Sequence, residues 1–129
     1  MEINRITIAG LGLIGGSLAK AFRRTNPNFE IIGVDKDRNN LALALKDGTI
    51  NKAFQRIEEA VSNSQVIFVC TPVTSIPSLL KTLAGILKPG TIITDVGSVK
   101  TKIIEQAAQI LPRDIFFIGG HPMAGAERS

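Results

Sequence analysis

The sequence contains no tryptophan and no tyrosine, and it has one cysteine and one histidine among 129 residues. The single cysteine, Cys70, excludes an internal disulfide, and its place at the end of an apolar run is typical of a buried thiol in a reducing compartment. Aromatic residues make up 5% of the chain, which leaves few side chains to stack on nucleic-acid bases. These absences argue against a disulfide-stapled secreted domain and against a nucleic-acid-binding module.

Long runs of charge and long hydrophobic runs are also missing. Fifteen Lys and Arg residues outnumber eleven Asp and Glu and give a net charge of +4, but the longest basic run is the pair Arg23-Arg24, as expected of a solvated surface. No apolar stretch approaches the roughly 20 residues that span a bilayer, and the first residues do not form a secretory leader. We therefore expect a cytoplasmic protein with neither a membrane nor a nucleic-acid partner.

What the sequence does have is a hydrophobic content of 44% in a length typical of one domain. Short apolar runs alternate with helical patterns along the whole chain, which indicates repeated strand–helix units around a parallel sheet. We expect one doubly wound α/β domain of the Rossmann type over residues 1–129, with helices on both faces of the sheet. The expected strands are 6–9, 31–34, 53–54, 66–70, 91–94 and 115–118, and the expected helices are 13–26, 41–47, 57–61, 76–87 and 103–111.

Three of the expected helices show an apolar face at helical spacing. This face consists of Ile14, Leu18, Ala21 and Phe22 in the first helix, of Leu41, Ala44 and Leu45 in the second, and of Ile103, Ile104, Ala107, Ala108 and Leu111 in the last. We expect these faces to pack against the sheet.

The residues of chemical interest follow the expected strands. The first, second, fourth, fifth and sixth strands are followed by Gly10, Asp35, Thr71, Asp95 and His121, respectively. Ligands of doubly wound folds bind in the crevice beyond the carboxyl ends of the strands. We therefore predict a single cleft at this edge of the sheet.

The loop after the first strand reads GLGLIG and predicts a dinucleotide site. Gly10 permits the tight turn, Gly12 lets the backbone approach a pyrophosphate, and Gly15 lets the helix pack closely on the strand. Leu13 and Ile14 open the helix whose N-terminal N–H groups would face the phosphates. A merely structural glycine turn is the alternative, which the strand before it and the helix after it disfavour.

Asp35 closes the second strand, twenty residues after Gly15. A carboxylate at this spacing accepts hydrogen bonds from the ribose hydroxyls of the adenosine half and repels a 2′-phosphate, so we predict NAD as the cofactor rather than NADP. The neighbouring cations Lys36 and Arg38 weaken this choice. A turn that begins at Asp35 is the alternative interpretation.

Two further segments follow later strands. Cys70, Thr71, Pro72 and Val73 leave the fourth strand at the topological switch point, where their backbone would line the cofactor, and a local helix start is an equally good explanation. Ser98 follows the fifth strand and, taken alone, is an ordinary helix N-cap. We predict no metal site.

His121 carries the only imidazole of the chain. Its unperturbed pKa lies near neutrality, which suits it to accept a proton as hydride leaves a carbinol or ring-hydroxyl carbon. It stands between Gly120 and Pro122, off the end of the sixth strand and next to the predicted cofactor. We predict that His121 is the catalytic base of a dehydrogenase, with an ordinary surface or core histidine as the alternative.

These segments together resemble the prephenate dehydrogenase family, which includes the arogenate and cyclohexadienyl dehydrogenases. The resemblance covers essentially the whole chain, and its last two segments are far more specific than the first. The segments are residues 10–19 (GLGLIGGSLA), 71–73 (TPV), 95–100 (DVGSVK) and 119–125 (GGHPMAG) with Glu127.

The resemblance implies NAD-dependent oxidative decarboxylation of prephenate to 4-hydroxyphenylpyruvate, in the tyrosine branch of aromatic amino-acid biosynthesis. It also implies that His121 hydrogen-bonds the substrate hydroxyl and takes its proton, and that Ser98 orients the hydroxyl or the imidazole. Glu127 is a weaker candidate near the substrate entrance, and a solvated carboxylate is at least as good an interpretation of it.

Members of this family continue into a largely helical second domain that dimerises and contributes cationic contacts to the substrate carboxylates. The present chain stops at Ser129, inside the active-site motif, so we expect residues 1–129 alone to bind the cofactor with little or no turnover. Arogenate is the alternative to prephenate as the substrate. A hydroxyacid or imino-acid reductase and a nucleotide-sensing module without chemistry also stay open, although neither needs the Gly-Gly-His-Pro motif.

Overall fold

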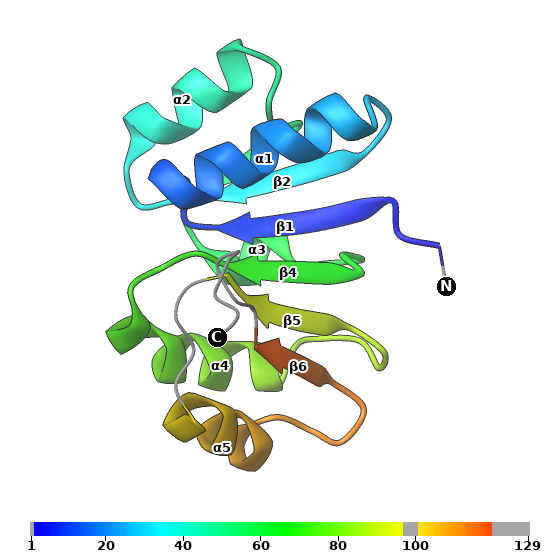
Figure 1. Cartoon of the computed structure of the whole chain (residues 1–129), viewed down its shortest axis with the longest axis vertical. Helices are drawn as coiled ribbons and strands as arrows, with labels where there is room; N and C mark the ends of the chain where they lie inside the picture. Colours follow the sequence, from blue (N-terminus) through cyan, green and yellow to red (C-terminus); the bar gives the residue numbers. More distant parts are fainter. Residues whose placement is uncertain (1, 97–100, 120–129) are drawn as a thin grey trace, which may run out of the picture.

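The computed structural model describes residues 2–96 and 101–119. In these ranges six parallel strands form one sheet in the order β3-β2-β1-β4-β5-β6 (Figure 1). The strands are β1 (Arg5–Ala9), β2 (Glu30–Val34), β3 (Lys52–Phe54), β4 (Val66–Val69), β5 (Ile92–Asp95) and β6 (Phe116–Gly119). The helices are α1 (Leu13–Thr25), α2 (Arg38–Lys46), α3 (Ile57–Ala60), α4 (Ile76–Ala84) and α5 (Thr101–Ile110), with a 3₁₀ turn, η1 (Val73–Ser75), before α4.

The strand order creates a switch point in the middle of the sheet. The chain begins at β1, winds outward through β2 to β3, and then returns to place β4 on the other side of β1. The loops that follow β1 and β4 therefore leave the sheet in opposite directions (Figure 1). This is the position at which doubly wound folds bind their ligands, and the predicted fold class is confirmed.

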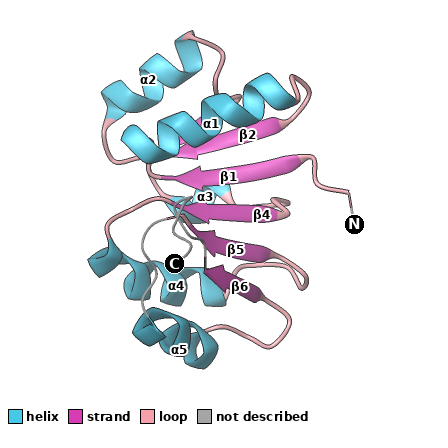
Figure 2. Ribbon diagram, viewed as in Figure 1, coloured by secondary structure: helices cyan, strands magenta, loops and turns pink. Residues whose placement is uncertain are grey.

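Helices cover both faces of the sheet, because the side chains of each strand alternate between two separate apolar clusters. One cluster packs Ile67, Val69 and Ile93 against α3, α4 and α5. The other packs Ile6 and Ile8 against α1 and α2. Figure 2 shows α1 and α2 with the β1–β2 half of the sheet, and α4 and α5 with the β5–β6 half.

The element boundaries differ from the predicted ones by a few residues. Helix α4 ends at Ala84 rather than at residue 87, because Gly85 forms its C-cap and glycine is a poor helix former. Strand β4 ends one residue early, which leaves Cys70 in the following loop. Strand β5 includes Asp95 as its last residue.

The predicted apolar faces of α1, α2 and α5 are each wrong at one large apolar side chain. Ile14 is 55% exposed, Leu45 is 44% exposed and Ile104 is 47% exposed. Helix α1 instead buries Gly15 and Ala19, because its first turn lies so close to the glycine turn that only a small residue fits there. Of the three predicted residues in α2, Leu41 is the buried one.

The edge strand β6 carries apolar side chains on both faces. Phe117 packs against the cluster that includes α4 and α5. Phe116 and Ile118 point to the other face and are 54% and 53% exposed. Two large apolar side chains on neighbouring positions of one face form an exposed apolar surface at this edge of the sheet.

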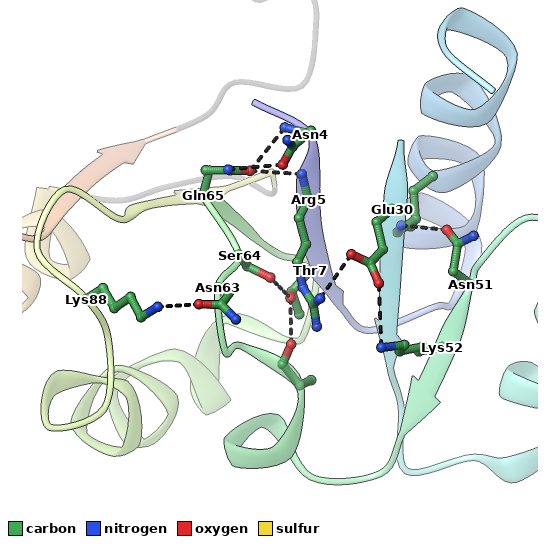
Figure 3. Close-up of polar contacts among 12 residues, drawn as sticks. Asn4, Arg5, Thr7, Glu30, Asn51, Lys52, Asn63, Ser64, Gln65 and Lys88 are labelled. Carbon is green, nitrogen blue, oxygen red and sulfur yellow. Dashed lines mark hydrogen bonds and ion pairs between the residues drawn. The ribbon is translucent and has the colours of Figure 1, made fainter. Parts of the chain in front are cut away.

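A polar network ties together the amino ends of the strands (Figure 3). Gln65 Oε1 accepts the backbone N–H of Arg5 at 2.8 Å. The buried hydroxyl of Thr7 lies 2.6 Å from Ser64 Oγ and donates to the carbonyl of Ala60 at 3.1 Å. Because these bonds satisfy polar groups inside the fold, they explain the buried hydroxyls here without a functional role.

Candidate functional site

The turn after β1 has no room for side chains at two of its glycines. Gly10 adopts a φ of 98°, which L-residues rarely adopt, and a Cβ atom there would lie 2.9 Å from the carbonyl oxygen of Cys70. A Cβ atom on Gly15 would lie 1.7 Å from the carbonyl oxygen of Gly10. Gly10 also donates its N–H to Val34 at 2.7 Å. These contacts join the turn to β2 and to the loop after β4.

Gly12, unlike Gly10 and Gly15, has open space at the position where a side chain would begin. Among the described residues, no heavy atom outside its own helix and chain neighbours lies within 4 Å of the position that its Cβ would take. Gly12 is the N-cap of α1, and neither a side-chain cap nor an acidic residue in the first turn satisfies the N–H groups of this helix. A helix N-terminus of this kind offers free donors and a partial positive charge to a phosphate group.

Leu13 and Ile14 belong to this first helical turn but do not line the main cleft. Their side chains are 88% and 55% exposed. Leu13 lines a smaller cavity between α1 and α2 instead, and the role of both residues in cofactor binding stays a prediction.

Asp35 lies directly after β2 and is bonded to the glycine turn. Its Oδ2 atom accepts the backbone N–H of Leu11 at 2.8 Å and the side-chain amide of Asn40 at 3.3 Å. Its Oδ1 atom accepts the backbone N–H of Asp37 at 2.9 Å. The carboxylate predicted to bind the ribose is therefore in direct contact with the predicted phosphate loop. The bond to Asp37 shows that Asp35 also begins a local turn, which was the alternative interpretation of this residue.

The start of α2 is capped by a side chain, in contrast to the start of α1. Asp37 caps α2 by accepting the backbone N–H groups of Asn39 at 2.8 Å and Asn40 at 3.4 Å. Arg38 donates from Nε to Gln55 at 3.3 Å. Because the carboxylate of Asp37 already accepts two N–H groups at the N-terminus of α2, this end of the helix is less favourable for an anion than the start of α1.

The segment after β4 lines the cleft and also starts a helix. Cys70, Thr71 and Pro72 are among the lining residues. Thr71 Oγ1 is buried and makes no hydrogen bond within the described ranges. Pro72 precedes η1 and its carbonyl accepts the N–H of Ser75 at 2.9 Å, so the segment does start a helix. That its backbone lines the cofactor stays a prediction. Val73 lies in η1, outside the cleft lining.

The thiol of Cys70 is a poor nucleophile in this position. Burial, followed by the charge of Asp95, raises its pKa to about 12. Asp95 is 1% exposed at the end of β5. The cysteine is therefore held as a neutral thiol at the wall of the cleft.

These elements enclose a cleft of about 820 Å³ at the carboxyl ends of β1, β2, β3 and β4. A cleft of this size lies within the range of small-molecule and cofactor sites. Its lining residues lie at or just beyond the strand ends, or on the helices that face the cleft. Those that come from the strand ends and the helix starts include Gly10, Gly12, Asp35, Lys36, Asn40, Gln55, Arg56, Cys70, Thr71, Pro72 and Ser75.

Sequence reasoning missed the part of the cleft that lies after β3. Gln55 and Arg56 line it there, and Arg56 pairs with Glu58 at 2.9 Å. Leu79 of α4 and Asn40 of α2 also line it. Gln55 and Arg56 follow a strand end like every other site residue, but a strand of three residues is too weak a pattern to assign a role to the residues after it.

Three predicted site residues, Ser98, His121 and Glu127, lie outside the described residues. Over residues 2–96 and 101–119, no group of three or more His, Cys, Asp and Glu side chains is placed to hold a metal ion. None of the helices in the same ranges is long and apolar enough to cross a bilayer.

The contact between the glycine turn and Asp35 at the switch point defines a nucleotide-binding domain of the Rossmann class. Comparison with protein families narrows this class. The family described as "Prephenate dehydrogenase, nucleotide-binding domain" matches residues 18–129, and the chain belongs to this family.

Curated relatives agree with this assignment. The prephenate dehydrogenase of Bacillus subtilis (strain 168) is 40% identical over 125 residues, which are 96% of this chain and 34% of that protein. The prephenate dehydrogenase of Lactococcus lactis subsp. cremoris is 39% identical over 129 residues, 98% of this chain and 36% of that protein. The chain thus spans about a third of the length of these two relatives.

Solved structures share the fold. The prephenate dehydrogenase of A. aeolicus, in complex with hydroxyphenyl propionate and NAD+, has a TM-score of 0.84 and 30% identity, and the match covers 99% of this chain and 44% of that one. The arogenate dehydrogenase of Synechocystis has a TM-score of 0.81 and 39% identity, covering 95% of this chain and 42% of that one. Both of these solved structures are dehydrogenases by name.

Proposed function

We propose that this chain is the cofactor-binding part of an NAD-dependent dehydrogenase that oxidatively decarboxylates prephenate to 4-hydroxyphenylpyruvate in tyrosine biosynthesis. The observation that carries the proposal is the hydrogen bond between Asp35 and Leu11, which brings a ribose-binding carboxylate to the open, uncapped N-terminus of α1. Membership of the prephenate dehydrogenase family supports the choice of reaction.

The described residues fit NAD. Gly12 leaves open space for a pyrophosphate, the first N–H groups of α1 are free to donate to it, and the cleft leads from there to Asp35. Asp35 lines this cleft, and a carboxylate that binds the ribose would repel a 2′-phosphate, which favours NAD over NADP. Lys36 also lines the cleft, and its positive charge reduces the preference for NAD without removing it.

When bound, NAD supplies the hydride acceptor of the reaction. The proposed role of His121 is to hydrogen-bond the substrate hydroxyl and accept its proton as the C–H bond of the same ring carbon breaks. The proposed role of Ser98 is to orient that hydroxyl or the imidazole. As the carboxylate leaves as carbon dioxide, the electron pair of the broken C–C bond enters the ring and makes it aromatic, and the ring oxygen regains the proton from His121 to give 4-hydroxyphenylpyruvate.

The remaining parts of the proposal concern the longer protein. The chain covers about a third of its curated relatives, so we propose that a further, largely helical domain supplies the dimer interface and cationic contacts to the substrate. Residues 1–129 alone would then bind the cofactor and turn over poorly. Arogenate is the second candidate substrate, because the arogenate dehydrogenase of Synechocystis is 39% identical to this chain.

Calorimetric titration of the chain with NAD and with NADP tests the cofactor. We expect clear binding of NAD and much weaker binding of NADP. Equal binding of the two would overturn the proposed role of Asp35, and no binding of either would overturn the cofactor site itself.

Substitution of His121→Asn in the intact protein tests the chemistry. NADH formation with prephenate and with arogenate identifies the substrate of the unchanged protein. The variant is expected to bind NAD normally and to lose most of its turnover, since a missing general base costs about 10²- to 10⁴-fold. Unchanged turnover would contradict the proposed role of His121 as the general base.

A further inference from the structure

Asn40 connects the predicted ribose carboxylate to two neighbouring cavities. Its side chain is half-buried in the first turn of α2, where Nδ2 donates to Asp35 Oδ2 at 3.3 Å. Asn40 lines the main cleft and also a smaller cavity of about 230 Å³ between α1 and α2. Gly12 is the other residue that lines both. Asn40 therefore stands beside the phosphate loop as well as beside the carboxylate.

The hydrogen bonds of Asp35 leave one of its two oxygens available. A carboxylate oxygen has two lone pairs, and those of Oδ2 are taken by the N–H of Leu11 and by Asn40. Within the described part of the chain, Oδ1 accepts one bond, from the N–H of Asp37. One lone pair of Oδ1 thus remains for a ligand.

Asn40 also keeps a free donor. Its amide nitrogen carries two hydrogens, and one of them is directed at Asp35 Oδ2. The second makes no hydrogen bond to any residue in the described ranges. Asp35 and Asn40 are joined by a hydrogen bond, both line the main cleft, and together they offer one acceptor and one donor. A single hydroxyl group satisfies such a pair, because a hydroxyl both donates and accepts.

We propose that Asn40 determines specificity for the adenosine ribose together with Asp35. The 2′-hydroxyl donates to Asp35 Oδ1 and its oxygen accepts from Asn40 Nδ2. The inference rests on the proposed cofactor function and adds a second residue to the ribose site. In this arrangement Asn40 contributes to affinity through the hydroxyl, as well as by holding Asp35 in place.

The test compares NAD with its analogue that lacks the 2′-hydroxyl on the adenosine ribose. Both ligands are titrated into the unchanged chain, into Asn40→Ala and into Asn39→Ala. Asn39 is the matched control, since it is an exposed residue of the same type in the same helical turn and is absent from the cleft lining. Where Asn40→Ala does not fold, Asn40→Leu removes the donor and keeps the size of the side chain.

We expect the unchanged chain and Asn39→Ala to bind NAD about tenfold more tightly than the deoxy analogue, which corresponds to one lost hydrogen-bonded hydroxyl. In Asn40→Ala the affinity for NAD falls and this ratio shrinks severalfold. If Asn40→Ala weakens both ligands equally, or neither, Asn40 does not contact the hydroxyl and the inference is wrong. If the unchanged chain binds no NAD, the proposed function fails first.

Discussion

The carboxylate of Asp35 accepts the backbone N–H of Leu11 at 2.8 Å, although the two residues are 24 positions apart in the chain. This bond makes the glycine turn after β1 and the carboxylate after β2 one structural unit. A ligand that binds the phosphate loop therefore meets a carboxylate whose position is already set, so little ordering entropy is lost on binding.

Substitution of Asp35→Asn should weaken cofactor binding without unfolding the domain. The amide oxygen of asparagine can still accept the Leu11 N–H, but the ribose loses a charged acceptor, worth about 1.5–3 kcal/mol or roughly 10- to 100-fold in affinity. The preference for NAD over NADP should also narrow, because a negative charge near the 2′-phosphate is gone. Titration calorimetry with both nucleotides measures this.

The control for this change is Asp114→Asn, which removes one charge from an exposed residue before the amino end of β6. It should leave both affinities unchanged. An Asp35→Asn variant that binds NAD as tightly as the control would contradict the role of the carboxylate.

Substitution of Gly15→Ala should destabilise the fold severely. The new Cβ would lie 1.7 Å from the carbonyl oxygen of Gly10, so the first turn of α1 must move away from the strand. We expect a loss of about 3 kcal/mol or more in the free energy of unfolding, or failure to fold. Urea denaturation followed by circular dichroism gives the value.

The matched variant Gly12→Ala should do the opposite. Residues 2–96 and 101–119 place no neighbouring atom within 4 Å of its Cβ position, and its φ is −70°, so the free energy of unfolding should change by less than about 1 kcal/mol. The affinity for NAD should nevertheless fall by about tenfold or more, because the methyl group occupies the approach of the pyrophosphate. Stability losses of equal size in both variants would be inconsistent with this description of the turn.

Cys70 should resist alkylation while the domain is folded. Burial and Asp95 raise the pKa of its thiol to about 12 from an ordinary value of 9.0, and the thiolate is the reactive form. At about pH 8 we expect iodoacetamide to modify the urea-unfolded chain far faster than the folded chain. Equal rates would show that the thiol is not held in its neutral form.

The same shift in the pKa of Cys70 predicts a dependence of stability on pH. Between about 9 and about 12 the unfolded chain loses the thiol proton while the folded chain keeps it, so the free energy of unfolding falls as the pH rises. Cys70→Ala should lack this part of the decline. The difference between the two unfolding curves, measured at several alkaline pH values, isolates the contribution of the thiol from that of the lysines.

The two faces of the β5–β6 half of the sheet should differ in their tolerance of substitution. Ile93 is fully buried, and Ile93→Ala should cost about 2–5 kcal/mol of stability. Ile118 is 53% exposed, and Ile118→Ala should cost less than about 1 kcal/mol. Denaturant unfolding of both variants measures these losses in the free energy of unfolding. A large loss for Ile118→Ala would mean that another surface covers this strand.

The fold was predictable because its signals are local. The alternation of short apolar runs with helical patterns predicted six strands and their class, and the spacing between Gly15 and Asp35 predicted a nucleotide site. The errors arose where packing overrides pattern. Ile14 has the right spacing for a buried face, yet the close approach of Gly15 to the glycine turn leaves it exposed.

Part of the cleft was not predictable for a different reason. Nothing in the sequence marks Asn40 or Arg56 as a site residue, because each reaches the cleft only through the position of its helix or strand beside β2. A hydrogen bond such as that from Asn40 to Asp35 depends on the pitch of α2 as well as on the residue types.

The sequence by itself determined the glycine turn, the order of strands and helices, and the carboxylate at the end of β2, since each depends on a few consecutive residues and their backbone preferences. The tertiary structure alone decided that Leu11, Asp35 and Asn40 form one hydrogen-bonded group. The parallel register of β1 with β2, in which Ala9 pairs with Val34, brings these distant segments to the same edge, and no local preference encodes that register.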